Sequence, residues 1–357
     1  MKTLFGIAQT SIRILPYLAL MRVLILLLFL VCGGLAMIMI PSSGKDPMIH
    51  GVSLVNPPRE ITSDHMGEVK RIHADWVAVI PYAFSRSGEP GVSFDHERQW
   101  WGERTDGSCK LIEYAQSHNL KVMIKPHVWV RGEGWTGDFN LTSEADWEQW
   151  EQEFSAYILN YAKVADSLKV DMLCIGTEYR IPAKERPDFW RGLIRKVRTI
   201  YSGKITYASN WDNFEIITWW DAVDYIGIDA YFPLAEGAHP SIEEIEQGWK
   251  PIKVQLGAFS KKWGKPILFT EYGFQSANGA AGKHWEIDES EENVNTQLQA
   301  DAYEATYRAL MEEEWFAGGF LWKWHFHTRS DRWRGTEWTP QSKPAEEVIA
   351  RWYGRKD

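Results

Sequence analysis

The sequence contains few cysteines and no excess of positive charge. Only Cys32, Cys109 and Cys174 occur among its 357 residues, so the chain is not a disulfide-rich scaffold. We expect Cys109 and Cys174 to be buried thiols, with a disulfide between them as the alternative if the chain is exported. The formal net charge is -9. Because nucleic-acid binding relies on cationic neutralisation of phosphates, this charge argues against a nucleic-acid partner.

Sequence motifs for nucleotide and metal binding are also missing. No Gly-x-Gly-x-x-Gly motif follows a predicted strand, which argues against an open, doubly wound nucleotide-binding sheet. His325 and His327 are spaced like a pair of metal ligands. A metal-dependent barrel hydrolase, however, would carry His-x-His on its first strand and further histidines on its fifth and sixth. The first predicted strand offers only His50, and the fifth and sixth offer none. We therefore expect no metal and no other cofactor.

Tryptophan, in contrast, is abundant. The chain has 20 Trp against 15 Phe and 14 Tyr, although core packing favours smaller apolar residues because a buried indole N–H needs a partner. Such an excess indicates a surface that stacks against flat partners, sugars or bases, and the negative charge favours sugars. A simpler role as anchors in the core accounts equally well for part of these residues.

One long hydrophobic run lies near the N-terminus. Residues 23–40 carry no charge, and a helix of that length, rising about 1.5 Å per residue, just spans a bilayer core of roughly 30 Å. The charged residues of segment 1–22 are all basic and should stay cytoplasmic. We expect an uncleaved anchor that places the catalytic domain on the exported side, periplasmic or extracellular. The alternative is a signal peptide cleaved after Ala36, which would release a secreted protein.

A polar, turn-rich linker at residues 41–47 precedes a single predicted domain at residues 48–357. Strand-like and helix-like runs alternate through this domain, without a second linker or a repeat. Eight strands separated by helices favour a (β/α)8 TIM barrel. The predicted strands are 48–55, 75–82, 121–128, 171–178, 204–209, 224–231, 266–271 and 319–324. The predicted helices are 61–73, 109–117, 147–165 with a capping box from Ser143 to Asp146, 187–201, 242–263 and 296–313.

A glutamate ends two of these predicted strands. Glu178 closes the fourth and Glu271 closes the seventh. The active site of a (β/α)8 barrel lies at the C-terminal ends of its strands, and these two strands are nearly opposite each other. Two carboxylates across a cleft can hydrolyse a glycoside, since one attacks the anomeric carbon and the other protonates the leaving oxygen. A separation of roughly 5 Å between them would mean retention of configuration.

These two motifs also resemble a known family. The segments "IGTEYR" at 175–180 and "LFTEYGF" at 268–274 are similar to the acid/base and nucleophile motifs of the clan A retaining (β/α)8 glycosidases. Further segments resemble glycoside hydrolase family 113, known for β-mannanases: "GVSL" at 51–54, "KPHVWV" at 125–130, "ASNW" at 208–211, "DYIGIDAYFPL" at 224–234 and "GFLWKW" at 319–324. The resemblance implies Glu178 as acid/base, Glu271 as nucleophile and β-linked mannose polymers as substrate.

One position departs from the pattern of the clan. Most members have Asn before the acid/base, where its side chain contacts the sugar 2-hydroxyl, whereas this chain has Thr177. The Thr177 hydroxyl can make the same contact, and so can Asn210 at the end of the fifth predicted strand. This departure bears on the identity of the sugar more than on the reaction.

Several further residues are predicted to contact the substrate. Tyr231 occupies a position where the clan often places a hydrogen-bond donor to the nucleophile, although a purely packed tyrosine is the alternative. One of Trp322 and Trp324, which share a face of the eighth predicted strand, is expected to form the floor under the cleaved sugar. Lys125 and His127 end the third strand and can donate to hydroxyls, with a structural role as the alternative for His127. Residues in the loops after strands three and five can line further subsites: Trp129, Trp135 and Trp211.

The sequence thus predicts a membrane-tethered, retaining β-glycosidase that acts on β-linked polysaccharide or oligosaccharide, with β-mannan as the favoured substrate. One alternative is a hydrolase of the same clan that acts on β-glucan or another β-hexoside. A carbohydrate-binding barrel without turnover is the other. The presence of both glutamates argues against it, because binding alone does not need the pair.

Overall fold

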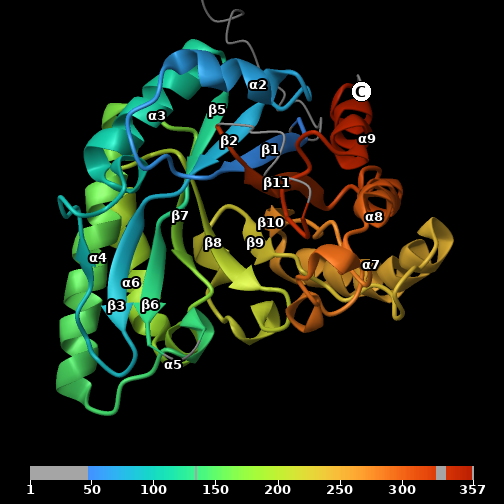
Figure 1. Cartoon of the computed structure of the whole chain (residues 1–357). Coiled ribbons are helices and arrows are strands. Elements are labelled where there is room, and N and C mark those ends of the chain that lie inside the picture. The colour runs from blue at the N-terminus through green and yellow to red at the C-terminus, as the bar shows by residue number, and fades with distance from the viewer. Residues whose placement is uncertain (1–46, 133–134, 327–334, 356–357) are drawn as a thin grey trace, which may run out of the picture. The chain divides into compact units, whose positions relative to one another are not determined.

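The computed structural model describes residues 47–132, 135–326 and 335–355 (Figure 1). Pro47–Asp357 forms one compact unit. The predicted anchor at residues 23–40 lies outside the described residues, as does Cys32. Within the described ranges, no helix combines the length and the apolar character needed to cross a bilayer.

Eight parallel strands close into a barrel in the order β1-β11-β10-β9-β8-β7-β5-β2. Each predicted strand corresponds to one of them, so the predicted barrel is confirmed. The strands are buried on both faces, and for this reason they are recognisable as nearly continuous apolar runs. They are β1 (Ile49–Leu54), β2 (Trp76–Val79), β5 (Lys121–Ile124), β7 (Met172–Thr177), β8 (Lys204–Asn210), β9 (Ile226–Asp229), β10 (Ile267–Tyr272) and β11 (Phe316–Trp324).

Helices connect most of the strands. The Ser143 side chain caps α4 by accepting a hydrogen bond from the Asp146 amide at 3.1 Å, as the sequence predicts. The connection from β8 to β9, which is fully described, contains only the 3-10 turns Phe214–Ile216 and Trp220–Ala222. The helices are α2 (Met66–Lys70), α3 (Thr105–Ser117), α4 (Glu144–Ser167), α5 (Arg180–Glu185), α6 (Pro187–Arg198), α7 (Ile242–Trp263), α8 (Thr296–Leu310) and α9 (Pro344–Tyr353); α5 and α9 were not among the predicted helices.

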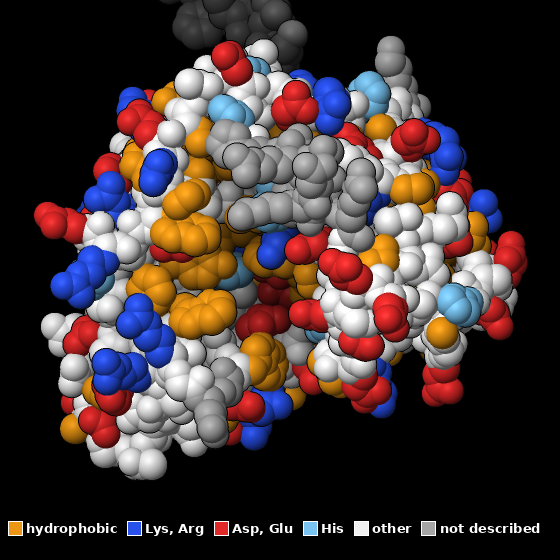
Figure 2. All heavy atoms as spheres, in the orientation of Figure 1, with side chains coloured by type: hydrophobic (Ala, Val, Ile, Leu, Met, Phe, Trp, Pro, Cys, Tyr) orange, Lys and Arg blue, Asp and Glu red, His pale blue; other side chains and the backbone are white. Residues whose placement is uncertain are grey.

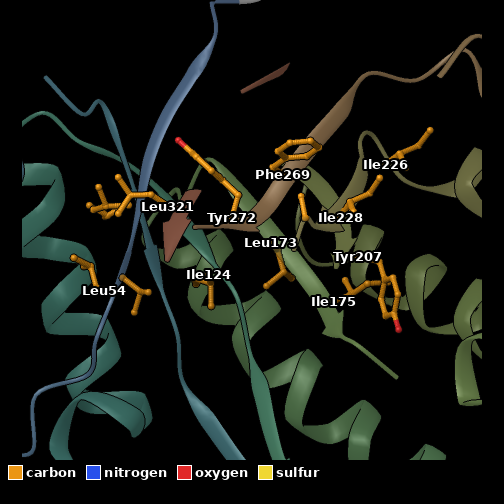
Figure 3. Close-up of a cluster of buried hydrophobic side chains, with 14 of the residues drawn as sticks. Leu54, Ile124, Leu173, Ile175, Tyr207, Ile226, Ile228, Phe269, Tyr272 and Leu321 are labelled. Atoms are coloured by element: carbon orange, nitrogen blue, oxygen red, sulfur yellow. The ribbon is translucent and has the colours of Figure 1, made fainter. Parts of the chain in front are cut away.

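Alternate residues of the strands fill two apolar layers. In β7, Met172 and Cys174 point into the barrel interior, where they pack with residues such as Phe320. Leu173 and Ile175 belong to the layer between the barrel and the helices, part of which is shown in Figure 3. Cys109 and Cys174 are both free thiols, so the alternative of a disulfide between them is wrong.

Two predicted strands are each divided in two. The predicted strand 75–82 stops at Val79 and resumes after Pro81 as β3 (Tyr82–Arg86), and 121–128 resumes after Pro126 as β6 (His127–Arg131). Proline lacks the N–H that a strand ladder needs, which explains the interruption at the barrel rim. Beyond the rim β3 pairs with β6 and with β4 (Ser93–Phe94) in a separate three-stranded sheet (Figure 1).

The close approach of β8 and β9 depends on Gly227, which generates a testable prediction. A Cβ at this position would lie 2.1 Å from the carbonyl oxygen of Tyr207 and 2.6 Å from Oγ1 of Thr206. Gly227→Ala should therefore destabilise the fold by about 3 kcal/mol or more, since backbone atoms cannot move aside. Gly67→Ala in α2, where an added Cβ meets nothing within 4 Å, is the matched control and should be neutral or slightly stabilising. Thermal unfolding of both variants checks the prediction, and equal melting temperatures would contradict it.

Candidate active site

A cavity of about 830 Å³ opens at the C-terminal ends of the barrel strands. Figure 2 shows this hollow, with acidic side chains at its base and hydrophobic side chains beside it. Both predicted catalytic glutamates line it. The other predicted residues in its lining are His127, Trp129, Trp135, Thr177, Asn210, Trp211, Tyr231 and Trp322.

Glu271 lies in β10 and is 6% exposed. The Tyr231 hydroxyl donates a hydrogen bond of 2.7 Å to its Oε2, while the Lys125 ammonium contacts Oε1 and His127 Nε2 lies 3.4 Å from the same oxygen. Burial by itself would raise the pKa of Glu271, but Lys125 and His127 outweigh it and lower the pKa to about 2. This carboxylate is therefore ionised at neutral pH, as a nucleophile must be.

Lys125 lies beneath the cavity rather than in its wall. Its side chain has 0% exposure and is placed between Glu271 and Asp229, with 3.0 Å from Nζ to Asp229 Oδ1. The prediction that Lys125 donates to sugar hydroxyls is therefore wrong, because two buried carboxylates hold its ammonium below the cavity. Thr270 also donates to Asp229, at 2.7 Å. Burial, followed by the charge of Glu271, raises the pKa of Asp229 to about 7.

Glu178 directly follows β7 and has a left-handed backbone, with φ of 57°. This conformation is costly for a residue with a side chain and is typical of functional sites. Its amide donates to the Ala208 carbonyl at 2.8 Å, and Trp135 Nε1 donates to its Oε2 at 2.6 Å. Burial, then the charges of Asp229 and Glu271, raise the pKa of Glu178 to about 8, against the opposing hydrogen bond from Trp135. Glu178 is therefore protonated at neutral pH.

The two tryptophans of β11 are placed differently. The Trp322 ring lines the cavity and lies parallel to the His127 ring, with 6.1 Å between centroids. Trp324 has 0% exposure and packs between the barrel and the helices. Of the two candidates for the floor only Trp322 lines the cavity, and the prediction that the two share a face of the strand is wrong. Val52 pairs with Leu321 and Leu54 with Trp324. The extra residue in β11 shifts the alternation of side chains, and for this reason the two rings do not share a face.

The candidates for contact with the sugar 2-hydroxyl both line the cavity. The Thr177 hydroxyl lies 3.5 Å from the Pro126 carbonyl oxygen to which it donates, and the Asn210 amide donates to Asp212 at 2.9 Å. Trp211 stacks on Trp285 with 6.1 Å between ring centroids and forms another part of the wall.

Sequence reasoning missed part of the site. Asp229 carries a signal that was available, since it is a carboxylate within an otherwise apolar strand. The loops after β10 and β11 follow no periodic pattern and gave no such signal. His284, Trp285 and Trp338 lie in these loops, line the cavity and were not predicted. Tyr82 on β3 also lines the cavity and was not predicted. His327 lies outside the described residues, and the described ranges contain no group of three or more His, Cys, Asp or Glu placed to hold a metal.

Comparisons with known proteins show which solved structures have a similar fold. The structure is similar to the β-mannanase AaManA from Alicyclobacillus acidocaldarius in complex with ManMIm, with 27% identity, a TM-score of 0.76 and coverage of 86% of this chain and 97% of that one. A β-1,4-mannanase of the same family gives 25% identity, a TM-score of 0.76 and coverage of 87% and 100%. A β-glucuronidase from Ruminococcus gnavus, at 14% identity, a TM-score of 0.59 and coverage of 86% and 50%, shares the fold alone.

A search of curated protein sequences finds no match. The model of glycoside hydrolase family 113, in contrast, matches residues 58–347. This range contains both glutamates of the cavity and every barrel strand other than β1. The chain therefore belongs to glycoside hydrolase family 113.

Proposed function

We propose that this glycoside hydrolase is a retaining β-mannanase, with Glu271 as nucleophile and Glu178 as acid/base. The observation that carries the proposal is the opposite protonation of two glutamates in one cavity. The pKa of Glu271 is lowered to about 2 and that of Glu178 is raised to about 8. Such a division between an ionised and a protonated carboxyl is what hydrolysis of a glycoside by a carboxyl pair requires, and the resemblance of both motifs to those of the clan A retaining glycosidases supports retention.

In the first step, Glu271 attacks the anomeric carbon and forms a bond to it as the glycosidic bond breaks. Glu178 gives its proton to the departing oxygen, so the leaving sugar departs as a neutral alcohol. The Tyr231 hydroxyl keeps its proton, because burial raises its pKa well above the usual value, and it holds the attacking carboxylate in place through Oε2.

In the second step, Glu178 is a carboxylate and takes a proton from water. The resulting hydroxide equivalent attacks the anomeric carbon, and Glu271 leaves as a carboxylate that Lys125 stabilises. Two inversions give net retention. Mannan is proposed as the polymer because the similar structures at 25–27% identity are named β-mannanases. Assays of product formation from β-mannan, β-glucan and xylan test this choice, and cleavage of β-glucan alone would contradict it.

Variants of the two glutamates should separate the two steps. Glu271→Ala should lower turnover of every substrate by about 10⁴-fold or more. Glu178→Ala should still form the glycosyl-enzyme from aryl mannosides whose leaving group needs no proton, so stopped-flow assays should show a burst followed by slow release. Glu347→Ala in α9, an exposed glutamate outside the cavity, is the control and should behave as wild type. Wild-type hydrolysis of mannan by either active-site variant would refute the assignment.

The buried ammonium should set the acid limit of activity. Activity needs ionised Glu271 and is lost as the pH falls through its pKa of about 2, and it needs protonated Glu178 and is lost as the pH rises through about 8. Lys125→Met removes the cation that lowers the pKa of Glu271, so the acid limb of kcat/KM should move up by about one pH unit or more. Tyr231→Phe should move it in the same direction. An acid limb that stays in place in a folded Lys125→Met protein, as checked by circular dichroism, would contradict this role.

A further inference from the structure

A short motif occurs twice where the chain leaves the barrel rim. Pro81–Arg86 has the sequence "PYAFSR" and Pro126–Arg131 has the sequence "PHVWVR". In each, the proline is followed by a side chain with a ring at the first and third positions and by an arginine at the fifth. The two segments form the paired strands β3 and β6. Side chains alternate along a strand, and directly paired residues share a face. One face of this sheet therefore carries three pairs, which we call the β3–β6 platform: Tyr82 with His127, Phe84 with Trp129, and Arg86 with Arg131.

The platform starts at the catalytic centre, and its strands are hydrogen-bonded to α4. Its innermost pair includes His127, which lies 3.4 Å from Glu271. At about 3.3 Å per residue, Arg131 lies roughly 13 Å further along the strand. From α4 the Tyr157 hydroxyl contacts the carbonyl oxygens of Pro81 at 2.9 Å and His127 at 3.0 Å. The face opposite the platform is therefore held against the domain, while Trp129 on the platform is 60% exposed.

Two further cavities, each sharing lining residues with the next, continue from the catalytic cavity along the platform, and we call the three together the groove. A second cavity of about 330 Å³ shares Tyr82, Trp129 and Trp322 with the catalytic cavity. A third, of about 920 Å³, shares Phe84, Trp100 and Arg131, among others, with the second. Trp100 is 51% exposed, so the groove offers indole faces at more than one point along its length.

The groove is built for a neutral, hydroxyl-rich ligand. Exposed indoles can stack on the apolar faces of sugar rings, and the guanidinium and carboxyl groups between them can bond to hydroxyls. The charges in the outermost cavity are mixed, so no strong field selects an anionic ligand. Its lining contains both arginines and glutamates: Arg86, Arg98, Arg131, Glu89, Glu97, Glu103 and Glu153.

The position of the acid gives the groove a direction. Glu178 and its donor Trp135 line only the catalytic cavity and not the two further cavities along β3 and β6. The leaving group of a glycoside must lie beside the acid that protonates it. Trp211 follows β8, the barrel neighbour of β7, and with its stacked partner Trp285 it lines the catalytic cavity but neither of the two further cavities. Resting on the proposed function, we propose that the β3–β6 platform binds the glycone side of a β-mannan chain, with about two sugars beyond the one that is cleaved.

The cleavage pattern of mannohexaose tests this inference. Hydrolysis in H₂¹⁸O labels the new reducing end, so mass spectrometry of the products gives the frequency of cleavage at each bond. Trp129→Ala should weaken the glycone side, shift cleavage toward the non-reducing end and lower kcat/KM for mannohexaose, relative to that for an aryl mannoside, by about three- to tenfold. Trp100→Ala should shift cleavage in the same direction. The matched control is Trp285→Ala, whose indole is 54% exposed, and it should shift cleavage toward the reducing end.

The outcomes separate this inference from the proposed function. If the wild-type chain cleaves mannohexaose but Trp129→Ala and Trp100→Ala keep its pattern, the platform does not bind the substrate. A shift toward the reducing end in those variants would show that the groove holds the leaving group instead, and would overturn the assigned direction. A wild-type chain that leaves mannohexaose and mannan intact would refute the proposed function itself.

Discussion

The site depends on one buried ammonium shared by two carboxylates. Lys125 has no exposed surface and lies between Glu271 and Asp229, with a third carboxyl, that of Glu178, in the same field. A single positive charge cannot stabilise three carboxylates in a region that water hardly reaches. The three carboxyl groups therefore differ in pKa. Glu271 is ionised, while the pKa of Asp229 is raised to about 7 and that of Glu178 to about 8.

Sequence reasoning located the barrel strands and the two glutamates because both follow from local pattern. Strands buried on two faces are continuous apolar runs, and a charge at the end of such a run is conspicuous. The direction of each side chain was harder to predict. Successive side chains of a strand point to opposite faces, so one extra residue reverses the direction of every side chain after it. One extra residue in β11 turned Trp324 away from the cavity, and Lys125 was drawn beneath it by Asp229. Such partners come from distant strands, and only the closed barrel brings them together.

The domain divides its tasks between the barrel and the sheet formed by β3, β4 and β6. The barrel holds the two glutamates of the cavity, one within β10 and one directly after β7, in a closed ring of parallel strands. The sheet beyond the rim arises where Pro81 and Pro126 interrupt two of those strands. Its composition can therefore change without altering the barrel hydrogen bonds. Its innermost pair still acts on the chemistry at the rim, because His127 lies 3.4 Å from Glu271 and helps to lower the pKa of that carboxyl.

In the proposed double displacement, the hydrogen bond from Trp135 to Glu178 acts on the two half-reactions in opposite ways. It stabilises the carboxylate form and so lowers the pKa of Glu178, which makes the protonated group a stronger acid toward the leaving oxygen and its carboxylate a weaker base toward water. Removing the indole donor would make Glu178 a weaker acid but a stronger base. A single donor thus sets a compromise between how readily the covalent intermediate forms and how quickly it is released. Under the proposed mechanism, the lifetime of that intermediate, and with it the chance that an acceptor sugar replaces water, would therefore depend on Trp135.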